Sequence, residues 1–239
     1  MTALYLANAL VVVTACWALW VRRDAFGSRW DAPITIGAAL YALAAVLDSA
    51  WPAVSAASFP LTGKYYLIPA LGHMSYLAGA AIGLKSGLLR ILPDGDVEPF
   101  MRARVLPVAG AAVAVMAVCV IASPATSAMS ADYLYLVFPD PWLTVYFATF
   151  FLTLTAVMIA AFLSCLLLRR HPGTTLVYPL MAAAVIGAVS CLTFLGLILS
   201  GRGDLVPTVA WPTAYTATVV ASLACGLSWR NRLRALAGQ

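Results

Sequence analysis

The chain has 239 residues, of which 63% are hydrophobic and only 10% are charged, and its mean hydropathy is +0.94. A soluble domain is about 45–50% apolar and about 25% charged, so this chain would leave too much apolar surface in contact with water. The composition therefore excludes a soluble enzyme, a disulfide scaffold and a disordered chain, and it predicts an all-α protein that crosses a membrane several times.

The few charged residues separate long apolar segments. Placing one charge at the centre of a spanning helix costs about 2.5–3.5 kcal/mol, so nearly charge-free stretches of about 20 residues are the main sign of a membrane span. Such stretches recur seven times, and only the second contains an acidic residue. We expect one domain of seven transmembrane helices near residues 3–21, 33–51, 65–86, 105–123, 142–168, 176–199 and 207–228, followed by a short basic tail at 230–239.

The segments between the expected helices are short. The longest hydrophilic piece, 92–104, has 13 residues, and we expect a solvated loop in which two arginines neutralise three carboxylates. Pro172 and Gly173 separate the fifth and sixth spans by only a few residues, which predicts antiparallel neighbours. With no soluble domain expected, the function must reside in the helices, their loops or a partner.

Basic residues are distributed unequally between the two sets of alternating loops. Cytoplasmic loops of membrane proteins carry the excess of Lys and Arg. Only Lys64 and Arg202 fall on one side. The other side carries 12 basic residues, namely Arg22, Arg23, Arg29, Lys85, Arg90, Arg102, Arg104, Arg169, Arg170, Arg230, Arg232 and Arg234. We therefore expect a multi-pass plasma-membrane protein with its amino terminus outside and its carboxyl terminus in the cytoplasm.

This topology also explains the basic sequence pI of about 9.1. In a soluble domain such a pI would suggest nucleic acid as a partner, whereas here the loop charges face anionic lipid. The expected partners are the lipid bilayer, a membrane or cytoplasmic protein, and a second copy of the chain, but not nucleic acid.

The first span and the cysteines carry no sign of processing or of a metal. No Lys or Arg precedes the first apolar stretch, so we expect an uncleaved helix rather than a signal peptide. All five cysteines fall within expected spans without a Cys-x-x-Cys pair, where they behave as small hydrophobic residues. We expect no disulfide, no metal site and no cofactor.

Asp48 and His73 are the most informative side chains, because intramembrane ionisable residues are candidates for function. Both are expected in the outer half of adjacent antiparallel helices, where a carboxylate and an imidazole are suited to binding a cation or relaying a proton. Tyr66 and Tyr76 share a helix face with His73, and Asn8 lies at a similar depth. The alternative is a hydrogen-bonded pair that fixes helix register, or a hydrated Asp48.

Gly79, Gly83 and Gly87 recur at four-residue spacing on the third expected span. Glycines at this spacing allow a second backbone to approach closely. We interpret them as a helix-packing surface within one chain, with homodimerisation as the alternative.

The chain resembles two groups of membrane proteins over roughly residues 1–90. The resemblance rests on Arg22-Arg23-Asp24 after the first span, and on Leu61-Thr62-Gly63 leading into the helix with Gly72-His73. One group is an actinobacterial family of seven-helix membrane proteins labelled as transporters. The other comprises the seven-helix input modules of bacterial histidine kinases. The resemblance implies a seven-helix bundle and transfers no catalytic residues.

The sequence contains no Gly-x-Ser-x-Gly, His-Glu-x-x-His or P-loop motif. We therefore expect a non-enzymatic sensor or partner-binding subunit with a small polar site in the outer half of the bundle. Because only ten residues follow Trp229, we expect a signalling role to use a separate partner. The alternative is a small-solute or ion transporter, or a channel, that uses the same outer vestibule.

Overall fold

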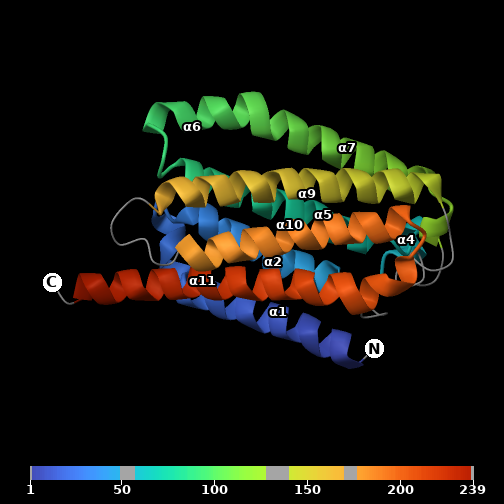
Figure 1. Ribbon diagram of the computed structural model, residues 1–239, viewed down its shortest axis with the longest axis horizontal. Coiled ribbons are helices and arrows are strands. Elements are labelled where there is room, and N and C mark those ends of the chain that lie inside the picture. Colours follow the sequence, from blue (N-terminus) through green and yellow to red (C-terminus); the bar gives the residue numbers. More distant parts are fainter. Residues whose placement is uncertain (1, 49–56, 128–139, 170–176, 238–239) are drawn as a thin grey trace.

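The computed structural model describes residues 2–48, 57–127, 140–169 and 177–237. All regular structure in these ranges is helical, and the long helices run side by side along one axis (Figure 1). The long helices are α1 (Thr2–Val21), α2 (Ala32–Leu47), α5 (Leu67–Leu88), α7 (Leu106–Ala122), α9 (Pro141–Leu168), α10 (Val177–Leu199) and α11 (Trp211–Ala237). Shorter helices are α4 (Phe59–Thr62), α6 (Asp94–Phe100) and the 3-10 turns Arg23–Gly27, Ala125–Ser127 and Gly203–Leu205.

Four of the described helical segments are long and apolar enough to cross a bilayer. They are Leu67–Leu88, Gly95–Ala122, Pro141–Leu168 and Val177–Leu199. Leu6–Val21 and Ala32–Leu47 are shorter apolar helices alongside them. The length and composition of these segments indicate a membrane protein.

The structure differs from the expected elements at two places. The prediction of a loop over 92–104 is wrong, because α6 and the π-helical turn Met101–Val105 lead without interruption into α7. Lys85 Nζ donates a 2.9 Å hydrogen bond to Glu98 Oε2 and so holds α6 against the end of α5. Of the expected basic tail, 230–239, the described residues 230–237 continue α11, which ends at Ala237.

Two prolines explain two π-helical turns, Met101–Val105 and Val206–Ala210. Pro107 and Pro212 have no N–H to offer the carbonyl four residues earlier. The preceding turns widen, and the N–H of Leu106 and that of Trp211 bond five residues back. The helices continue through these positions instead of breaking.

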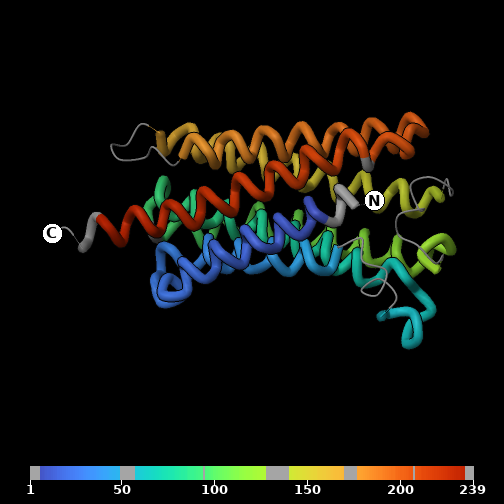
Figure 2. The backbone as a smooth tube through the Cα atoms, turned by 90° about the horizontal axis from the view of Figure 1, so that it is seen from below, coloured from blue at the N-terminus to red at the C-terminus, as the bar shows by residue number. Residues whose placement is uncertain are grey.

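Six of the long helices form a closed ring. Packing contacts join α1 to α2, α2 to α5, α5 to α9, α9 to α10, α10 to α11, and α11 back to α1. Helix α7 lies outside this ring, against α9 and α5 (Figures 1 and 2). The interior therefore lies between α2 and α5 on one side and α10 and α11 on the other.

The aromatic side chains of α9 form the centre of the buried core. Tyr146, Phe147, Phe150 and Phe151 are each buried, and Phe151 stacks on Phe194 of α10 at a ring-centroid distance of 4.7 Å. Many large apolar side chains elsewhere point outward, as expected for helices that face lipid.

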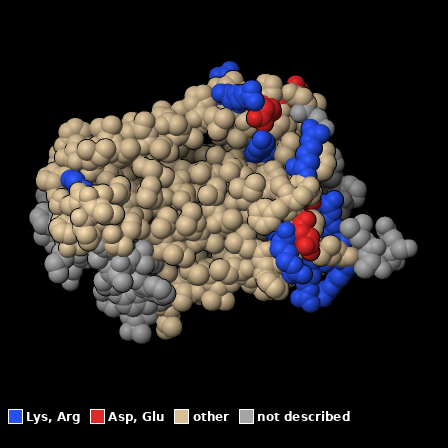
Figure 3. Space-filling view, turned by 180° about the vertical axis from the view of Figure 1, so that it is seen from behind, with Lys and Arg blue, Asp and Glu red and all other residues tan. Residues whose placement is uncertain are grey.

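Charged side chains collect at the ends of the bundle. Figure 3 shows most of the visible Lys and Arg at one end, which is the end with the carboxyl terminus, and a long tan surface between the ends. The loop that joins α1 to α2, the end of α5 and the end of α11 all meet at this basic end.

Candidate functional site

His73 joins three helices near the end of the bundle opposite the basic end. It lies on α5 and is 5% exposed. Its Nε2 lies 3.4 Å from Asp48 Oδ1, at the C-terminal end of α2, and its Nδ1 lies 2.8 Å from Tyr146 Oη on α9. The side chain of Asp48 is 38% exposed. The structure therefore brings the two residues singled out in the sequence to ion-pair distance and adds a tyrosine.

The geometry favours one protonation pattern for a neutral His73. A bare Nε2 lone pair facing the Asp48 carboxylate would be repelled, so the proton belongs on Nε2. Nδ1 then accepts a hydrogen bond from the Tyr146 hydroxyl. A protonated His73 would instead pair with the Asp48 carboxylate.

Aromatic rings hold the imidazole in place. Phe150 stacks on His73 at 4.4 Å between ring centroids, and Phe147 and Tyr66 present ring edges at 6.0 and 6.2 Å. Tyr66 therefore supports the ring of His73 rather than lining the central cavity described below.

The other predicted site residues lie in different places. Tyr76 points into the interior beside Tyr41 of α2, with 5.7 Å between ring centroids. Asn8 is buried, and its Nδ2 donates a 3.1 Å hydrogen bond to the carbonyl of Ala45, which joins α1 to α2. Asn8 is thus a packing contact apart from His73.

The three glycines of α5 have three different surroundings. A Cβ on Gly79 would lie 3.1 Å from the carbonyl oxygen of Gly37 on α2, so these backbones meet directly. A Cβ on Gly87 would lie 3.2 Å from Ser164 Cβ on α9. A Cβ on Gly83 would meet nothing within 4 Å. Two of the glycines therefore pack against helices of the same chain, and Gly83 opens onto an empty space.

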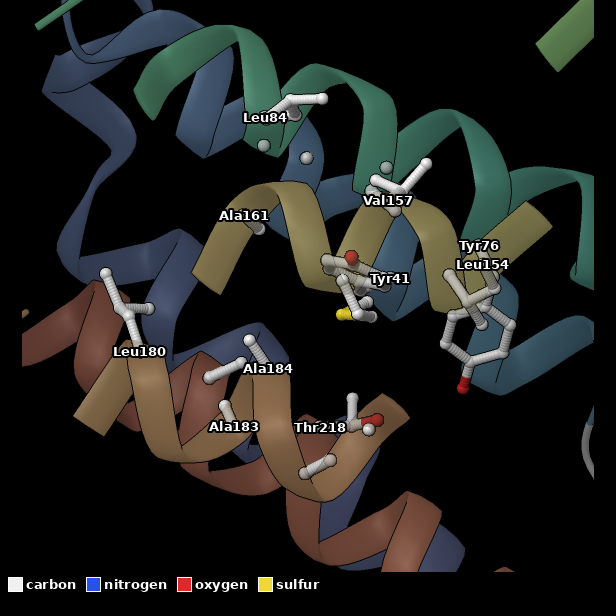
Figure 4. A pocket seen from close by; sticks show the side chains of 18 of the residues that line it. Tyr41, Tyr76, Leu84, Leu154, Val157, Ala161, Leu180, Ala183, Ala184 and Thr218 are labelled. Carbon is white, nitrogen blue, oxygen red and sulfur yellow. The ribbon is translucent and has the colours of Figure 1, made fainter. Parts of the chain in front are cut away.

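That space is a central cavity of about 270 Å³, lined by α2, α5, α9, α10 and α11. It exists because short side chains face one another across the ring. Those short side chains include Gly83, Ala161, Ala183, Ala184, Ala214 and Ala217. Figure 4 shows Tyr41 and Thr218 on facing walls, with Leu154 and Val157 beside Tyr41. The cavity is mostly apolar with a few hydroxyl groups, as is typical of small-molecule sites.

The central cavity extends along much of the bundle. Asp48 and His73 line one end, and Arg90, just after α5, lines the other. His73 and Arg90 are 17 residues apart, which corresponds to about 25 Å along a helix. This length approaches the thickness of a bilayer core, about 30 Å.

A buried arginine lies next to the basic end of the central cavity. Arg22 is 1% exposed, and Nε donates a 2.9 Å hydrogen bond to Thr35 Oγ1. Its two terminal nitrogens donate 3.2 Å hydrogen bonds to the carbonyls of Cys225 and Asp31. The guanidinium also lies over the ring of Trp229, 5.3 Å from its centroid. Arg22 thus joins the end of α1 and the start of α2 to the middle of α11.

A single carboxylate forms ion pairs with three arginines at the basic end of the bundle. Asp31, at the start of α2, pairs with Arg22 at 3.8 Å, with Arg90 at 3.3 Å and with Arg232 of α11. We call these four residues the Asp31 cluster. Its formal charge is +2, and it holds together the basic ends of four helices.

Sequence reasoning missed both Tyr146 and the Asp31 cluster. Tyr146 has a weak signal, since it is the one tyrosine in the stretch 141–168. The Asp31 cluster has no signal in the sequence, because its members are far apart in the chain and resemble the charged residues of ordinary loops. Among the described residues, no three His, Cys, Asp or Glu side chains come together as a metal site.

No protein-family model matches the chain, and comparisons with curated proteins and with solved structures gave no match.

Proposed function

We propose that the chain is a seven-span plasma-membrane protein with its amino terminus outside and its basic end in the cytoplasm. Seven long helices lie side by side within the described residues, and Lys and Arg gather at one end of the bundle. This is the distribution expected from the positive-inside rule.

Impermeant maleimide labelling of intact cells tests the orientation. In a variant without the native cysteines, Arg202→Cys should label from outside, and Arg104→Cys only after the membrane is opened. Both positions are exposed. The reverse pattern would refute the orientation.

We infer that the protein binds a small, largely apolar ligand in the central cavity and acts as a sensor. One observation carries this proposal, namely a cavity of about 270 Å³ that touches Asp48 and His73 at one end and the Asp31 cluster at the other. A ligand in that position contacts five helices at once, so its binding favours one arrangement of the ring over others.

Cavity filling tests this proposal. Ala184→Phe places a large ring in the central cavity, whereas Val185→Phe, the next residue on α10, replaces a side chain that is 45% exposed. Native mass spectrometry of protein purified from membranes should show a small-molecule adduct on the wild type and on Val185→Phe. The adduct should be absent from Ala184→Phe. Identical spectra for the two variants would refute the cavity as the site.

Transport is the second candidate function, and the length of the central cavity favours it. A cavity lined from His73 to Arg90 offers a path toward both ends of the bundle. Proteoliposomes loaded with the dye pyranine and given a pH gradient separate the two functions. Proton flux that is abolished by Asp48→Asn or by His73→Ala would establish transport and displace the sensor. A sensor gives no flux above empty liposomes.

A further inference from the structure

The basic end of the central cavity carries an excess of positive charge. The Asp31 cluster sets three guanidinium groups against one carboxylate. Of these three arginines, only Arg90 lines the central cavity. A mostly apolar cavity thus ends at a cation.

The guanidinium group of Arg90 has N–H donors that its hydrogen bond to Asp31 does not use. A guanidinium group carries five N–H donors, and Arg90 uses one of them on Asp31 Oδ1, at 3.3 Å, among the described residues. The oxygens of Asp31 also accept from Arg232 and from Ser28 Oγ, so Arg90 shares this carboxylate with other donors. The side chain of Arg90 is 36% exposed, so its remaining donors are accessible.

Ser86 supplies a second, independent observation. It lies near the C-terminal end of α5, four residues before Arg90 in the turn that follows the helix. It lines the central cavity and is 1% exposed, yet its Oγ has no hydrogen-bond partner among the described residues. A buried hydroxyl without a partner is unfavourable. A ligand oxygen placed between Ser86 and Arg90 would satisfy both.

The remaining wall near Arg90 suits a hydrocarbon chain. Leu84, Leu168, Leu180 and Ala184 are among the apolar residues that line the central cavity. The Asp48 carboxylate at the far end would repel a negative head group and so favours one orientation of a charged ligand.

We propose that the central cavity binds a single-chain anionic amphiphile, with its carboxylate or phosphate head on Arg90 and Ser86 and its chain directed toward His73. This inference rests on the proposed ligand-binding function and names the class of ligand. The two sources of such a head group, a fatty acid and a lysophospholipid, share the same chemistry and are separated by the test below.

The test uses the full chain in nanodiscs of zwitterionic lipid and a matched pair of probes. Tritiated palmitate and tritiated hexadecanol have the same chain and differ in the charge of the head group. Ala184→Phe, which fills the central cavity, defines the background. Palmitate should bind about tenfold more tightly than hexadecanol, the difference expected for a hydrogen bond to a charged group.

Variants locate the head group. Arg90→Gln should abolish the preference for palmitate, Ser86→Ala should reduce it, and Arg90→Lys should retain most of it because the charge remains. Arg102→Gln is the matched control, since Arg102 lies at the same end with a side chain 74% exposed. Displacement of tritiated palmitate by unlabelled lysophosphatidate and by unlabelled palmitate is then compared. If lysophosphatidate displaces the probe more effectively, the site is assigned to a phosphate head group. If it displaces the probe less effectively, the site is assigned to a carboxylate.

Four outcomes overturn the proposal. Equal binding of palmitate and hexadecanol would remove the head-group site and leave the proposed function standing. Equal effects of Arg90→Gln and Arg102→Gln would do the same. Displacement of palmitate by inorganic phosphate as effectively as by lysophosphatidate would show a small-anion site without a chain. If neither probe binds above the Ala184→Phe background, the proposed function fails as well.

Discussion

Replacing Asp31 by Asn leaves the shape of the Asp31 cluster nearly unchanged and removes its only negative charge. The side chain of Asp31 is 4% exposed, and that of Arg22 is 2% exposed. Arg22 would then be a buried cation beside two further arginines without a counter-charge. We expect the substitution to destabilise the junction of α1, α2 and α11.

The magnitude follows from the exposure of each partner. Removing one partner of a buried ion pair costs about 3–5 kcal/mol. Arg90 and Arg232 are 36% and 53% exposed and can turn toward water, so each of these pairs adds at most about 1 kcal/mol. Arg22 keeps its hydrogen bonds to Thr35 and to two carbonyls. The lower value, about 3 kcal/mol, is therefore expected.

Thermal unfolding of the detergent-solubilised protein, followed by size-exclusion chromatography, measures the effect. A loss of about 3 kcal/mol corresponds to a fall in Tm of about 6–12 °C in a protein of this size. The control is Asp24→Asn, whose side chain is 72% exposed and 4.0 Å from Arg23. The reasoning is refuted if both variants shift Tm equally. In the double variant Arg22→Met, Asp31→Asn, the loss should be smaller than the sum of the single losses.

Two further predictions concern stability. Gly79→Ala should lower the free energy of unfolding by about 1–3 kcal/mol, because the added methyl group forces α2 and α5 apart. Gly83→Ala should raise it by up to about 1 kcal/mol, because alanine has the higher helix propensity. The same Tm assay compares the two variants, and a larger loss of stability at Gly83 would contradict the packing. Burial raises the pKa of Asp140, but hydrogen bonds, led by the one from Ser123 Oγ at 2.5 Å, outweigh this effect and lower it below the ordinary value of 3.8. The resulting stabilisation is complete above pH 3.8 and is lost as the pH falls through the lowered pKa. The Tm deficit of Ser123→Ala should therefore be largest at neutral pH and shrink in acid, and a deficit independent of pH would exclude this role.

Most of the fold is predictable from the sequence because the cost of burying charge limits where helices lie. The expected span 142–168 compares with α9 at Pro141–Leu168, and 176–199 with α10 at Val177–Leu199. The helical segment before α7 was not predictable in this way. Its acidic and basic residues lower the local hydropathy to that of a loop, although they are compatible with a helix at a membrane edge.

The candidate site was predictable only where neighbours in sequence are also neighbours in space. Asp48 and His73 lie on consecutive long helices, so a short connection brings them together. Tyr146 comes 73 residues after His73, and Cys225 comes 203 after Arg22. Such contacts depend on the order of the helices around the ring, and the hydropathy profile does not indicate that order.

Helix α11 connects the central cavity to the Asp31 cluster. Thr218 faces the central cavity, and Arg232 of the same helix holds Asp31. No proline follows Pro212 in α11, so the 14 residues from Thr218 to Arg232 form a lever about 21 Å long. A small tilt of α11 at the central cavity therefore becomes a larger displacement at its carboxyl-terminal arginines.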